Sequence, residues 1–423
     1  MAEIKAFRGL RYDTGKAGGL DTLACPPYDI ISAEQRAGYL EKNPYNIIRL
    51  EQPIGEDCYE QAAGTLSDWL SVGILTQDAD ESLYVYELLF SVGGERKAVK
   101  GLITLVRLEE FSKGVILPHE ETLSKAKTDR FNLLSATHCN FSQIYSLYRD
   151  EDASVFAAVD DCSQGRPDAE FTDGDGVRHR LWHVCDEAAI TAFQRGFADK
   201  KLYIADGHHR YETALNYRNA LRAAGTPKPG ADYVCMMLVN MENDGLVVLP
   251  THRIVRDLPS FDAAALREAY GAYFDRAEGT FAEMTAKQAA AYANGEKAYV
   301  LYTGGNRFCL LTLRDRAVMD ALLPGASDAY RGLDVTVLHT LVLERILGID
   351  KANMANQVNL TYTRDAAEAV AAVDAGTANA CLLLSPTRVG EIRDVAAAGE
   401  KMPQKSTYFY PKLTTGLVLY RLW

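Results

Sequence analysis

The chain has 423 residues, more than one hydrophobic core usually organises, so two domains are expected. Its 45 Lys and Arg residues against 57 Asp and Glu residues give a formal net charge of −12, which would repel a nucleic-acid backbone. Generic nucleic-acid binding is therefore disfavoured. An anionic ligand has to be captured locally, by a few cations and backbone amides.

The cysteines and the N-terminal segment indicate the cellular compartment in which the protein is expected. The eight cysteines are scattered, without a Cys-x-x-Cys pair or a Cys/His cluster at zinc spacing, which indicates reduced and mostly buried thiols. The first residues lack the apolar region of a signal peptide, and no apolar run reaches the roughly 18 residues needed to span a bilayer. We expect a cytoplasmic protein that does not associate with membranes.

Strand and helix patterns alternate along the chain, which predicts a mixed fold of the α+β or α/β type. Residues 83–90 and 97–105 flank Gly93-Gly94 and predict an antiparallel hairpin. Further on, apolar spacing predicts a strand over 201–205 and a helix over 211–224, followed by a strand over 246–249.

A domain boundary is expected near Pro259-Ser260, where a turn precedes a new amphipathic helix beginning at Asp262. The first domain would then cover residues 1–258 and the second residues 259–423. In the second domain we expect a hairpin formed by residues 297–303 and 307–313. We also expect a β-α-β unit with strands over 358–362 and 381–384 and a helix over 366–373.

The strand-to-helix turn Asp206-Gly207-His208-His209-Arg210 is the strongest candidate for a ligand site. Glycine allows the backbone to approach a ligand closely, and a helix N-terminus offers free N–H groups with the positive end of its dipole. Arg210 can add a bidentate contact to a phosphate, and His208 or His209 can add a hydrogen bond or a proton. The alternative is that Asp206 only caps the helix while both histidines lie on the surface.

A second polar segment is Leu117-Pro118-His119-Glu120-Glu121, which is followed by charged residues at Lys125, Lys127, Asp129 and Arg130. Phosphoryl transfer to a hydroxyl needs a carboxylate that accepts the proton and cations that offset the charge of the phosphoryl group. Glu120 with Lys125, Lys127 or Arg130 can supply both. An ordinary solvated helix start is equally consistent with the spacing alone.

Three further segments are polar enough to consider. Lys405-Ser406-Thr407 lies in a turn-like stretch before the aromatic residues 408–410, and either contacts a substrate or is only a polar turn. His252-Arg253 is a further candidate phosphate contact, although a packed His beside a surface Arg is as good an explanation. Arg49 is a weaker candidate still, because a surface pair with Glu51 accounts for it.

The turn at Asp206 to Arg210, with Thr213 and Ala214 after it, resembles the phosphate-binding motif of the ParB/sulfiredoxin superfamily, and within it that of the free L-serine kinases. Pro118-His119-Glu120 is similar to a segment of those kinases in which the glutamate is the catalytic base. The stretch that ends in Lys405-Ser406-Thr407 looks like their closing segment. The chain also resembles a large bacterial family described only as a domain of unknown function.

The resemblance implies a ParB/sulfiredoxin-like catalytic core as the first domain, with the active site in the cleft between it and the second α/β domain. It implies transfer of a phosphoryl group from ATP, ADP or pyrophosphate to the hydroxyl of free L-serine, with Mg²⁺. Glu120 would be the base and His209 a further catalytic candidate. The expected ligand contacts are Asp206 to the metal, Gly207, His208, His209, Arg210 and Thr213 to the donor, and His119, Lys405, Ser406 and Thr407 to the substrate.

Two other classes of function compete with an enzyme. One is a non-catalytic sensor of a phosphorylated metabolite, in which a carboxylate such as Glu120 beside the phosphate would serve no purpose. The other is a ParB-like, nucleotide-dependent regulator, which would need a basic surface or a helix-turn-helix, and the sequence supplies neither. The sequence leaves the donor, the direction of the reaction and the oligomeric state open.

Overall fold

The structure is a computed structural model that describes residues 1–122, 124–259 and 261–423, with side chains except at 124–126. The chain forms two compact units. Unit 1 comprises Met1–Pro118, Thr122–Val247 and Pro411–Trp423, and unit 2 comprises His119–Glu121 and Val248–Tyr410. These units differ from the predicted division after residue 258, because each is assembled from separate stretches of chain that a composition-based boundary does not reveal. Ser260 of that predicted boundary lies outside the described residues.

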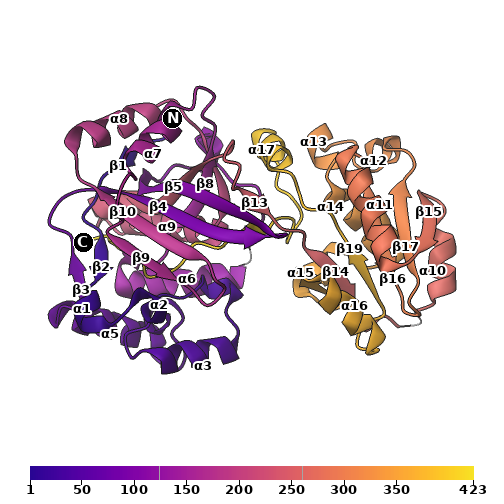
Figure 1. Cartoon of the computed structure of the whole chain (residues 1–423), viewed down its shortest axis with the longest axis horizontal. Coiled ribbons are helices and arrows are strands. Elements are labelled where there is room, and N and C mark those ends of the chain that lie inside the picture. The colour runs from indigo at the N-terminus through magenta and orange to yellow at the C-terminus, as the bar shows by residue number, and fades with distance from the viewer. Residues whose placement is uncertain (123, 260) are drawn as a thin grey trace. The chain divides into compact units, whose positions relative to one another are not determined.

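The large sheet of unit 1 has nine strands among the described residues, in the order β6-β11-β8-β12-β5-β4-β10-β9, with β1 also paired to β5 (Figure 1). The pairs β6–β11 and β8–β12 are parallel and the others are antiparallel, so the sheet is mixed. Its strands are β1 (Ile4–Lys5), β4 (Leu83–Val92), β5 (Glu95–Arg107), β6 (Ile116–Leu117), β8 (Ile144–Tyr148), β9 (Ala169–Thr172), β10 (Arg178–Val184), β11 (Leu202–Asp206) and β12 (Tyr233–Asn240). The hairpin predicted at Gly93-Gly94 is confirmed, since Val92 of β4 pairs with Glu95 of β5.

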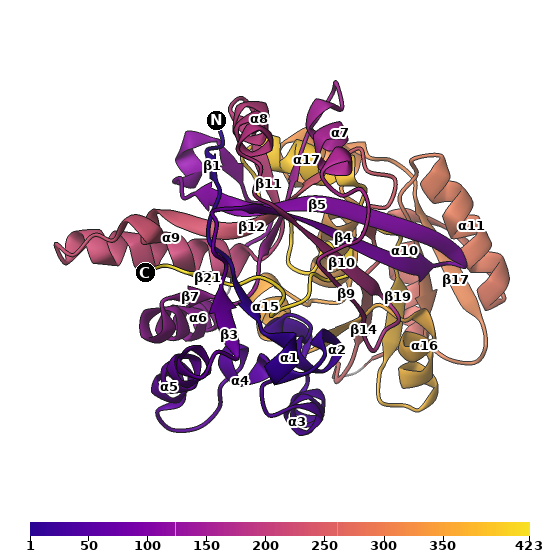
Figure 2. The ribbon, with the colours of Figure 1, turned by 60° about the vertical axis from the view of Figure 1, so that its left-hand side comes forward.

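Helices cover this sheet and build two apolar clusters. Leu83 and Val85 alternate along β4 and pack into one cluster with residues of α7 (Ser154–Asp161), α8 (Glu187–Phe197) and α9 (His208–Ala223). The second cluster joins the N-terminal helices, which gather on one side of unit 1 in Figure 2, to α6 (Ser124–Thr137). Its helices are α1 (Thr14–Ala17), α2 (Leu20–Leu23), α3 (Ala33–Lys42), α4 (Ile48–Glu51) and α5 (Cys58–Ser71). Its strands are β2 (Leu10–Tyr12), which pairs with β3 (Leu75–Gln77), and β7 (Cys139–Asn140), which pairs with β21 (Tyr420–Arg421) outside the cluster.

Unit 2 is built on a separate six-stranded sheet in the order β15-β17-β16-β19-β14-β18, in which every pairing is antiparallel. Its strands are β14 (His252–Val255), β15 (Phe274–Gly279), β16 (Ala298–Tyr302), β17 (Phe308–Leu313), β18 (Leu360–Thr363) and β19 (Ala380–Leu383). The predicted hairpin is β16–β17. The predicted β-α-β unit is also present, but its strands β18 and β19 are not neighbours, because β14 lies between them.

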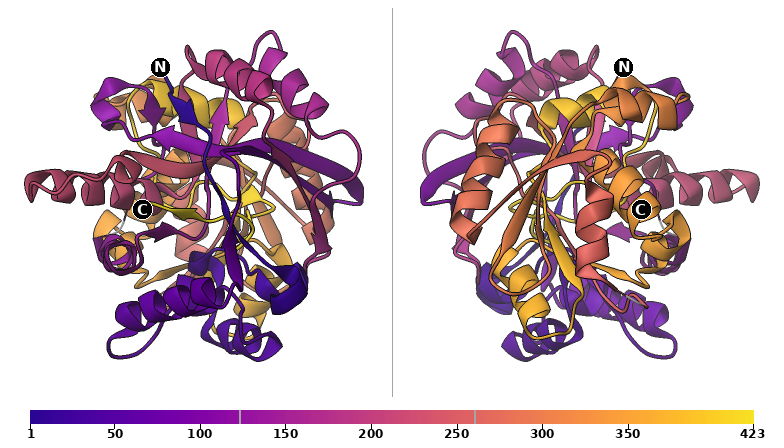
Figure 3. Two further views of the ribbon diagram at one scale, coloured as in Figure 1. Left: turned by 90° about the vertical axis from the view of Figure 1, so that its left-hand side faces the viewer. Right: turned by 90° about the vertical axis from the view of Figure 1, so that its right-hand side faces the viewer.

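Helices lie on both faces of the unit 2 sheet, as the right-hand view of Figure 3 shows. On one face Ile254 packs against α11 (Phe281–Ala293) and α16 (Ala366–Asp374). On the other face, Val255 packs with helices that include a π-helix, η4 (Leu338–Ile346). The remaining elements of the unit are α10 (Ala263–Tyr270), α12 (Ala317–Leu322), α13 (Asp328–Arg331), α14 (Asp334–Val337), α15 (Lys351–Asn356), α17 (Val389–Ala397) and β20 (Phe409–Tyr410), while β13 (Val247–Val248) falls where the units divide.

The architecture confirms a mixed α and β fold with one large mixed sheet and a separate antiparallel sheet. Both chain termini belong to unit 1. Within the described residues, the helices are too short or too polar to cross a membrane.

Candidate functional site

The predicted strand-to-helix turn is present in unit 1. Strand β11 ends at Asp206, Gly207 adopts a left-handed conformation with a φ of 96°, and α9 begins at His208. A Cβ atom at Gly207 would lie 2.9 Å from Nε of Arg210. Both the positive φ and this close approach of the Arg210 side chain require glycine here.

Asp206 is held between two cations. Its Oδ2 accepts a hydrogen bond from Nη2 of Arg210 at 2.7 Å, and its Oδ1 accepts one from Nζ of Lys412. Burial by itself would raise the pKa of Asp206, but the Lys412 ammonium and the Arg210 guanidinium hold it well below its usual range. Asp206 is therefore a carboxylate that orients two cations, and the N-cap position of α9 is held by Gly207, which has no side chain to cap the helix.

Arg210 is fixed by more than Asp206. Its Nη1 donates to the backbone oxygen of Gln143 at 2.6 Å and to Oγ of Ser142 at 3.0 Å. The side chain is 13% exposed, so the guanidinium is oriented by the segment that leads into β8. A ligand that meets Arg210 meets a preorganised cation.

A small cavity of about 50 Å³ lies beside Arg210. Its polar wall contains Arg130, Ser142, Thr213 and Glu51, and its other wall is mostly apolar. Thr213 is 3% exposed, and its Oγ1 has no hydrogen-bond partner among the described residues. A buried hydroxyl without a partner is uncommon and indicates a place where a ligand or water supplies the missing bond.

Glu51 and Arg130 are the charged pair of this polar wall. Arg130 donates to the backbone oxygen of Glu51 at 2.7 Å, lies 3.7 Å from its Oε1, and covers the ring of Tyr28 at 4.0 Å. Burial raises the pKa of Glu51, although Arg130 and Arg210 oppose this. The surface pair considered for Arg49 and Glu51 is wrong, because Glu51 is 3% exposed and pairs with Arg130 instead.

The other predicted charges near Arg130 have structural partners. Lys127 pairs with Glu212 at 3.0 Å, and Asp129 pairs with Arg130 at 2.6 Å and accepts a hydrogen bond from the Tyr59 hydroxyl. The side chain of Lys125 lies outside the described residues. Arg130 is therefore the one of these cations that the structure places in the cavity wall.

The two histidines of the turn differ in exposure. His208 is 4% exposed and its charge would lower the pKa of Asp206, whereas His209 is half-buried. The alternative in which both histidines lie on the surface is thus wrong for His208, because the first turn of α9 packs it into the unit.

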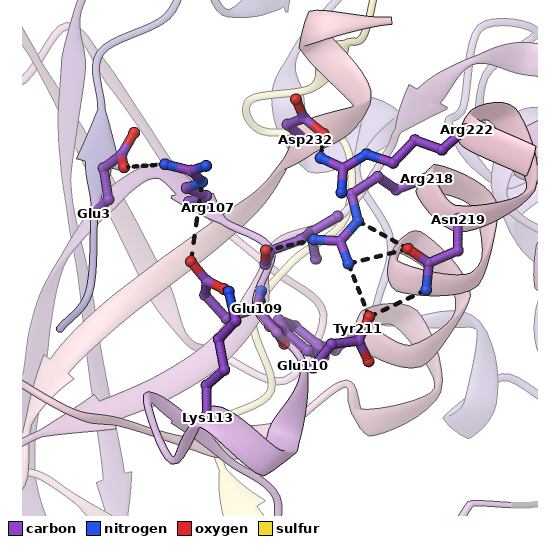
Figure 4. Close-up of polar contacts among 11 residues, drawn as sticks. Glu3, Arg107, Glu109, Glu110, Lys113, Tyr211, Arg218, Asn219, Arg222 and Asp232 are labelled. Carbon is purple, nitrogen blue, oxygen red and sulfur yellow. Dashed lines mark hydrogen bonds and ion pairs between the residues drawn. The ribbon is translucent and has the colours of Figure 1, made fainter. Parts of the chain in front are cut away.

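Helix α9 is anchored along its length by the network in Figure 4. The Tyr211 hydroxyl donates to the backbone oxygen of Glu109 at 2.7 Å and accepts from its N–H at 2.9 Å. Arg218 donates to the backbone oxygen of Leu108 at 2.5 Å and pairs with Glu110 at 2.9 Å. These contacts fix the register of the helix that carries Arg210 and Thr213.

In unit 2 the structure brings together predicted residues that are far apart in the sequence. Nε2 of His119 lies 3.0 Å from Oγ1 of Thr407, and Oε1 of Glu120 accepts the backbone N–H of Lys405 at 3.2 Å. Ser406 is buried, and its hydroxyl donates to the backbone oxygen of Pro403. The predicted base and the predicted substrate contacts therefore form one cluster, in which Glu120 is oriented by a backbone amide.

A model of the family described as "Protein of unknown function (DUF1015)" matches residues 4–336. The chain belongs to the DUF1015 family. No curated protein matches this DUF1015 member.

Several solved structures are similar to the DUF1015 chain at low identity. A conserved hypothetical protein from Pyrococcus furiosus is 12% identical with a TM-score of 0.36, over 74% of this chain and 92% of that chain. A free serine kinase in complex with AMP is 12% identical with a TM-score of 0.35, over 73% and 86%. SbnI with a C-terminal truncation, from Staphylococcus aureus, is 11% identical with a TM-score of 0.34, over 74% and 85%.

The expectation of a packed His beside a surface Arg at positions 252 and 253 of this DUF1015 protein needs correction. His252 is packed, and its Nδ1 accepts the backbone N–H of Leu384 at 3.1 Å. Arg253 is only 1% exposed, so it is not a surface residue. Because side chains alternate between the two faces of a strand, Arg253 points to the face of β14 that η4 covers. There its Nη2 lies 3.3 Å from Nε2 of His339.

The residues around Asp206 do not fit the predicted Mg²⁺ ligand. Both carboxylate oxygens are already bonded to cations, and Mg²⁺ needs oxygen ligands that are free to coordinate it. Across the described part of the chain, no group of three or more His, Cys, Asp or Glu side chains is arranged to hold a metal ion. We assign no chemical step to a metal at this residue.

The sequence did not identify Lys412, Glu51 or Tyr28 as residues that contact the charged groups of the site. Lys412 lies 206 residues from Asp206, and its only signal in the sequence is a lone cation after an aromatic-proline run. Tyr28 and Glu51 lie in N-terminal segments whose partner, Arg130, is on a different helix. Nothing in the local pattern marks such a contact.

Proposed function

We propose that this protein is a phosphotransferase that moves a phosphoryl group from ATP, ADP or pyrophosphate to the hydroxyl of free L-serine, giving O-phospho-L-serine. The observation that supports the proposal most directly is the cavity of unit 1, whose wall contains Arg130, Arg210 and the unpartnered hydroxyl of Thr213. Guanidinium groups in a partly buried wall bind phosphate oxygens in a bidentate manner, and a hydroxyl adds a directed donor.

The donor phosphates bind at this cavity and at the start of α9. Asp206 pairs with Lys412 and Arg210, and Glu51 lies beside Arg130, so the cations are fixed before the ligand arrives. Preorganised cations stabilise the charge that develops on the leaving phosphate without having to move. His209 and the backbone of Gly207 and His208 complete the contacts that the motif resemblance implies.

The acceptor is activated by Glu120 in unit 2. Glu120 takes the proton of the serine hydroxyl, whose oxygen forms a bond to the terminal phosphorus of the donor. The bond from that phosphorus to the bridging oxygen breaks, and the leaving phosphate or nucleotide keeps the electron pair. The backbone N–H of Lys405 orients the carboxylate through Oε1, and His119, Ser406 and Thr407 are the proposed substrate contacts. An active site in a cleft between two domains stays a prediction.

The test is direct synthesis. Purified full-length protein is incubated with L-serine, Mg²⁺ and ATP, ADP or pyrophosphate in turn, and phosphoserine is followed by ³¹P NMR and mass spectrometry. We expect phosphoserine with at least one donor, and the reverse reaction from phosphoserine with the matching acceptor. Phosphate binding without turnover in either direction would instead favour a sensor of a phosphorylated metabolite, and binding of DNA that depends on nucleotide would favour a ParB-like regulator.

A further inference from the structure

Unit 2 contains a cavity whose lining residues have no role in the proposed reaction, although it adjoins the Glu120 cluster through Met402, which bridges to Glu120. It has a volume of about 440 Å³, within the range of pockets that bind small molecules. Its wall combines the aromatic Tyr362, the imidazole of His339, the acidic Glu121 and Glu344, and the basic Lys351 and Lys401. The cavity therefore offers shape and charge for a ligand much larger than water.

Behind this wall lies a buried cation without a carboxylate partner. Arg253 donates to the backbone oxygens of Thr251 and Lys405 and to His339, and its guanidinium covers the ring of Tyr362 at 5.2 Å. Among the described residues its Nε has no hydrogen-bond partner, and the groups that act on its charge are Tyr362 and Tyr299, not carboxylates. Buried charges are normally paired, so a negative charge is missing from this part of the unit.

Arg253 also determines which ring nitrogen of His339 can donate a hydrogen bond. Arginine is a donor only, so Nε2 of His339, at 3.3 Å from Nη2 of Arg253, must be the acceptor. Burial, with Arg253 nearby, lowers the pKa of His339 well below its usual value, so the ring is neutral and its proton sits on Nδ1. A ring that lines the cavity is thus fixed as a hydrogen-bond donor.

The backbone of this wall is unusual in the same place. His339, Thr340 and Glu344 all belong to the π-helix η4, which spans Leu338–Ile346. A π-helix is a rare conformation that is frequently found at functional sites. The position of the oriented histidine on it is a second, independent sign that this cavity is a functional site.

We propose that the cavity of unit 2 binds a small metabolite through one anionic group, a carboxylate or a phosphate monoester. Nδ1–H of His339 donates to that group, and Lys351 and Lys401 attract it, while Arg253 supplies the positive potential behind His339. Glu121 and Glu344 disfavour a polyanion such as pyrophosphate, which separates this ligand from the donor of the proposed reaction. The site is a binding site in its own right and does not depend on the phosphotransferase activity.

The experiment is calorimetric titration of the full-length protein with L-serine, succinate, inorganic phosphate and O-phospho-L-serine. We expect at least one probe to bind wild type. His339→Phe keeps the ring and removes the donor, and Ala355→Trp fills the cavity, so each lowers affinity at least tenfold. Lys287→Met, a cation on the exposed face of α11, is the matched control for Lys401→Met and leaves affinity unchanged. Thermal unfolding of each variant shows whether it folds.

The outcomes distinguish a carboxylate ligand from a phosphate ligand, and binding in the cavity of unit 2 from binding in the cavity of unit 1. Binding of serine and succinate identifies a carboxylate ligand, whereas binding of phosphate and phosphoserine alone identifies a phosphate ligand. Arg210→Ala in unit 1 leaves this binding intact if the ligand occupies the cavity of unit 2. The proposal is overturned if no probe binds wild type, or if folded His339→Phe and Lys401→Met bind every probe as wild type does.

Discussion

Asp206 and Arg210 form an ion pair across the first turn of α9, with 2.7 Å between Oδ2 and Nη2. Lys412, from the C-terminal segment, occupies the other carboxylate oxygen. A residue expected to coordinate a metal thus holds two cations in place. The arrangement predicts how stability and ligand binding respond to changes at the turn.

The depressed pKa of Asp206 predicts a stability effect that depends on pH. The group is more acidic in the folded protein than at its unfolded value of about 3.9. Its contribution is therefore present above that value and is lost as the pH falls towards the folded pKa. Asp206→Asn should lower the free energy of unfolding at pH 7 by about 1–3 kcal/mol, because two half-buried cations lose their counter-ion. Urea unfolding at pH 7, 5 and 3.5 should show the gap between wild type and variant shrinking at the lowest pH. A gap that stays constant would contradict the assigned pKa.

Gly207→Ala tests the left-handed turn. The new Cβ would need a positive φ and would lie 2.9 Å from Nε of Arg210. We expect a loss of about 1–3 kcal/mol in stability and a displaced Arg210, with weaker binding of every phosphate donor. Gly225→Ala is the matched control, since Gly225 also has a positive φ, of 71°, but meets no neighbouring atom within 4 Å. It should cost stability without changing donor affinity, and equal donor affinity in both variants would argue against the role of Arg210.

Thr213→Val separates a structural hydroxyl from a binding hydroxyl. Oγ1 of Thr213 is buried and has no hydrogen-bond partner among the described residues, so valine should leave stability unchanged or raise it by about 1 kcal/mol. Affinity for inorganic phosphate should nevertheless fall, because the cavity loses a donor. Thr137→Val is the control, as its Oγ1 donates to the backbone oxygen of Leu133 at 2.8 Å. The control should lose stability and keep its phosphate affinity, measured by denaturant unfolding and calorimetry, and a reversal of this pattern would remove Thr213 from the site.

Glu120→Gln tests the proposed base. Glutamine keeps the size and accepts the Lys405 N–H but cannot take a proton, so kcat should fall by about 10²-fold or more while KM changes little. Glu296→Gln, on an exposed turn of unit 2, is the control and should behave as wild type. Rates of phosphoserine formation at saturating substrates decide the matter. If Glu120→Gln were as fast as wild type, the base would have to be another group.

Local features of the chain were readable from the sequence because their causes are local. Gly93-Gly94 dictates a tight turn between two strand patterns, and the structure has that hairpin. The turn at Asp206 to Arg210 follows from a short apolar strand, a glycine and a periodic helix in immediate succession. The residue types at the start of α9 were likewise enough to single out Arg210 as a candidate ligand contact.

The contacts that give those residues their chemistry depend on the tertiary structure. Whether Asp206 binds a metal or holds cations depends on Lys412, which reaches it from the other end of the chain. Glu51 looks like a surface residue in sequence, but folding buries it against Arg130. Arg253 looks like an exposed cation beside a packed histidine, and only its place on β14 beneath η4 leaves it buried. Burial and pairing of charge depend on segments distant in sequence, and the local pattern of residues does not encode them.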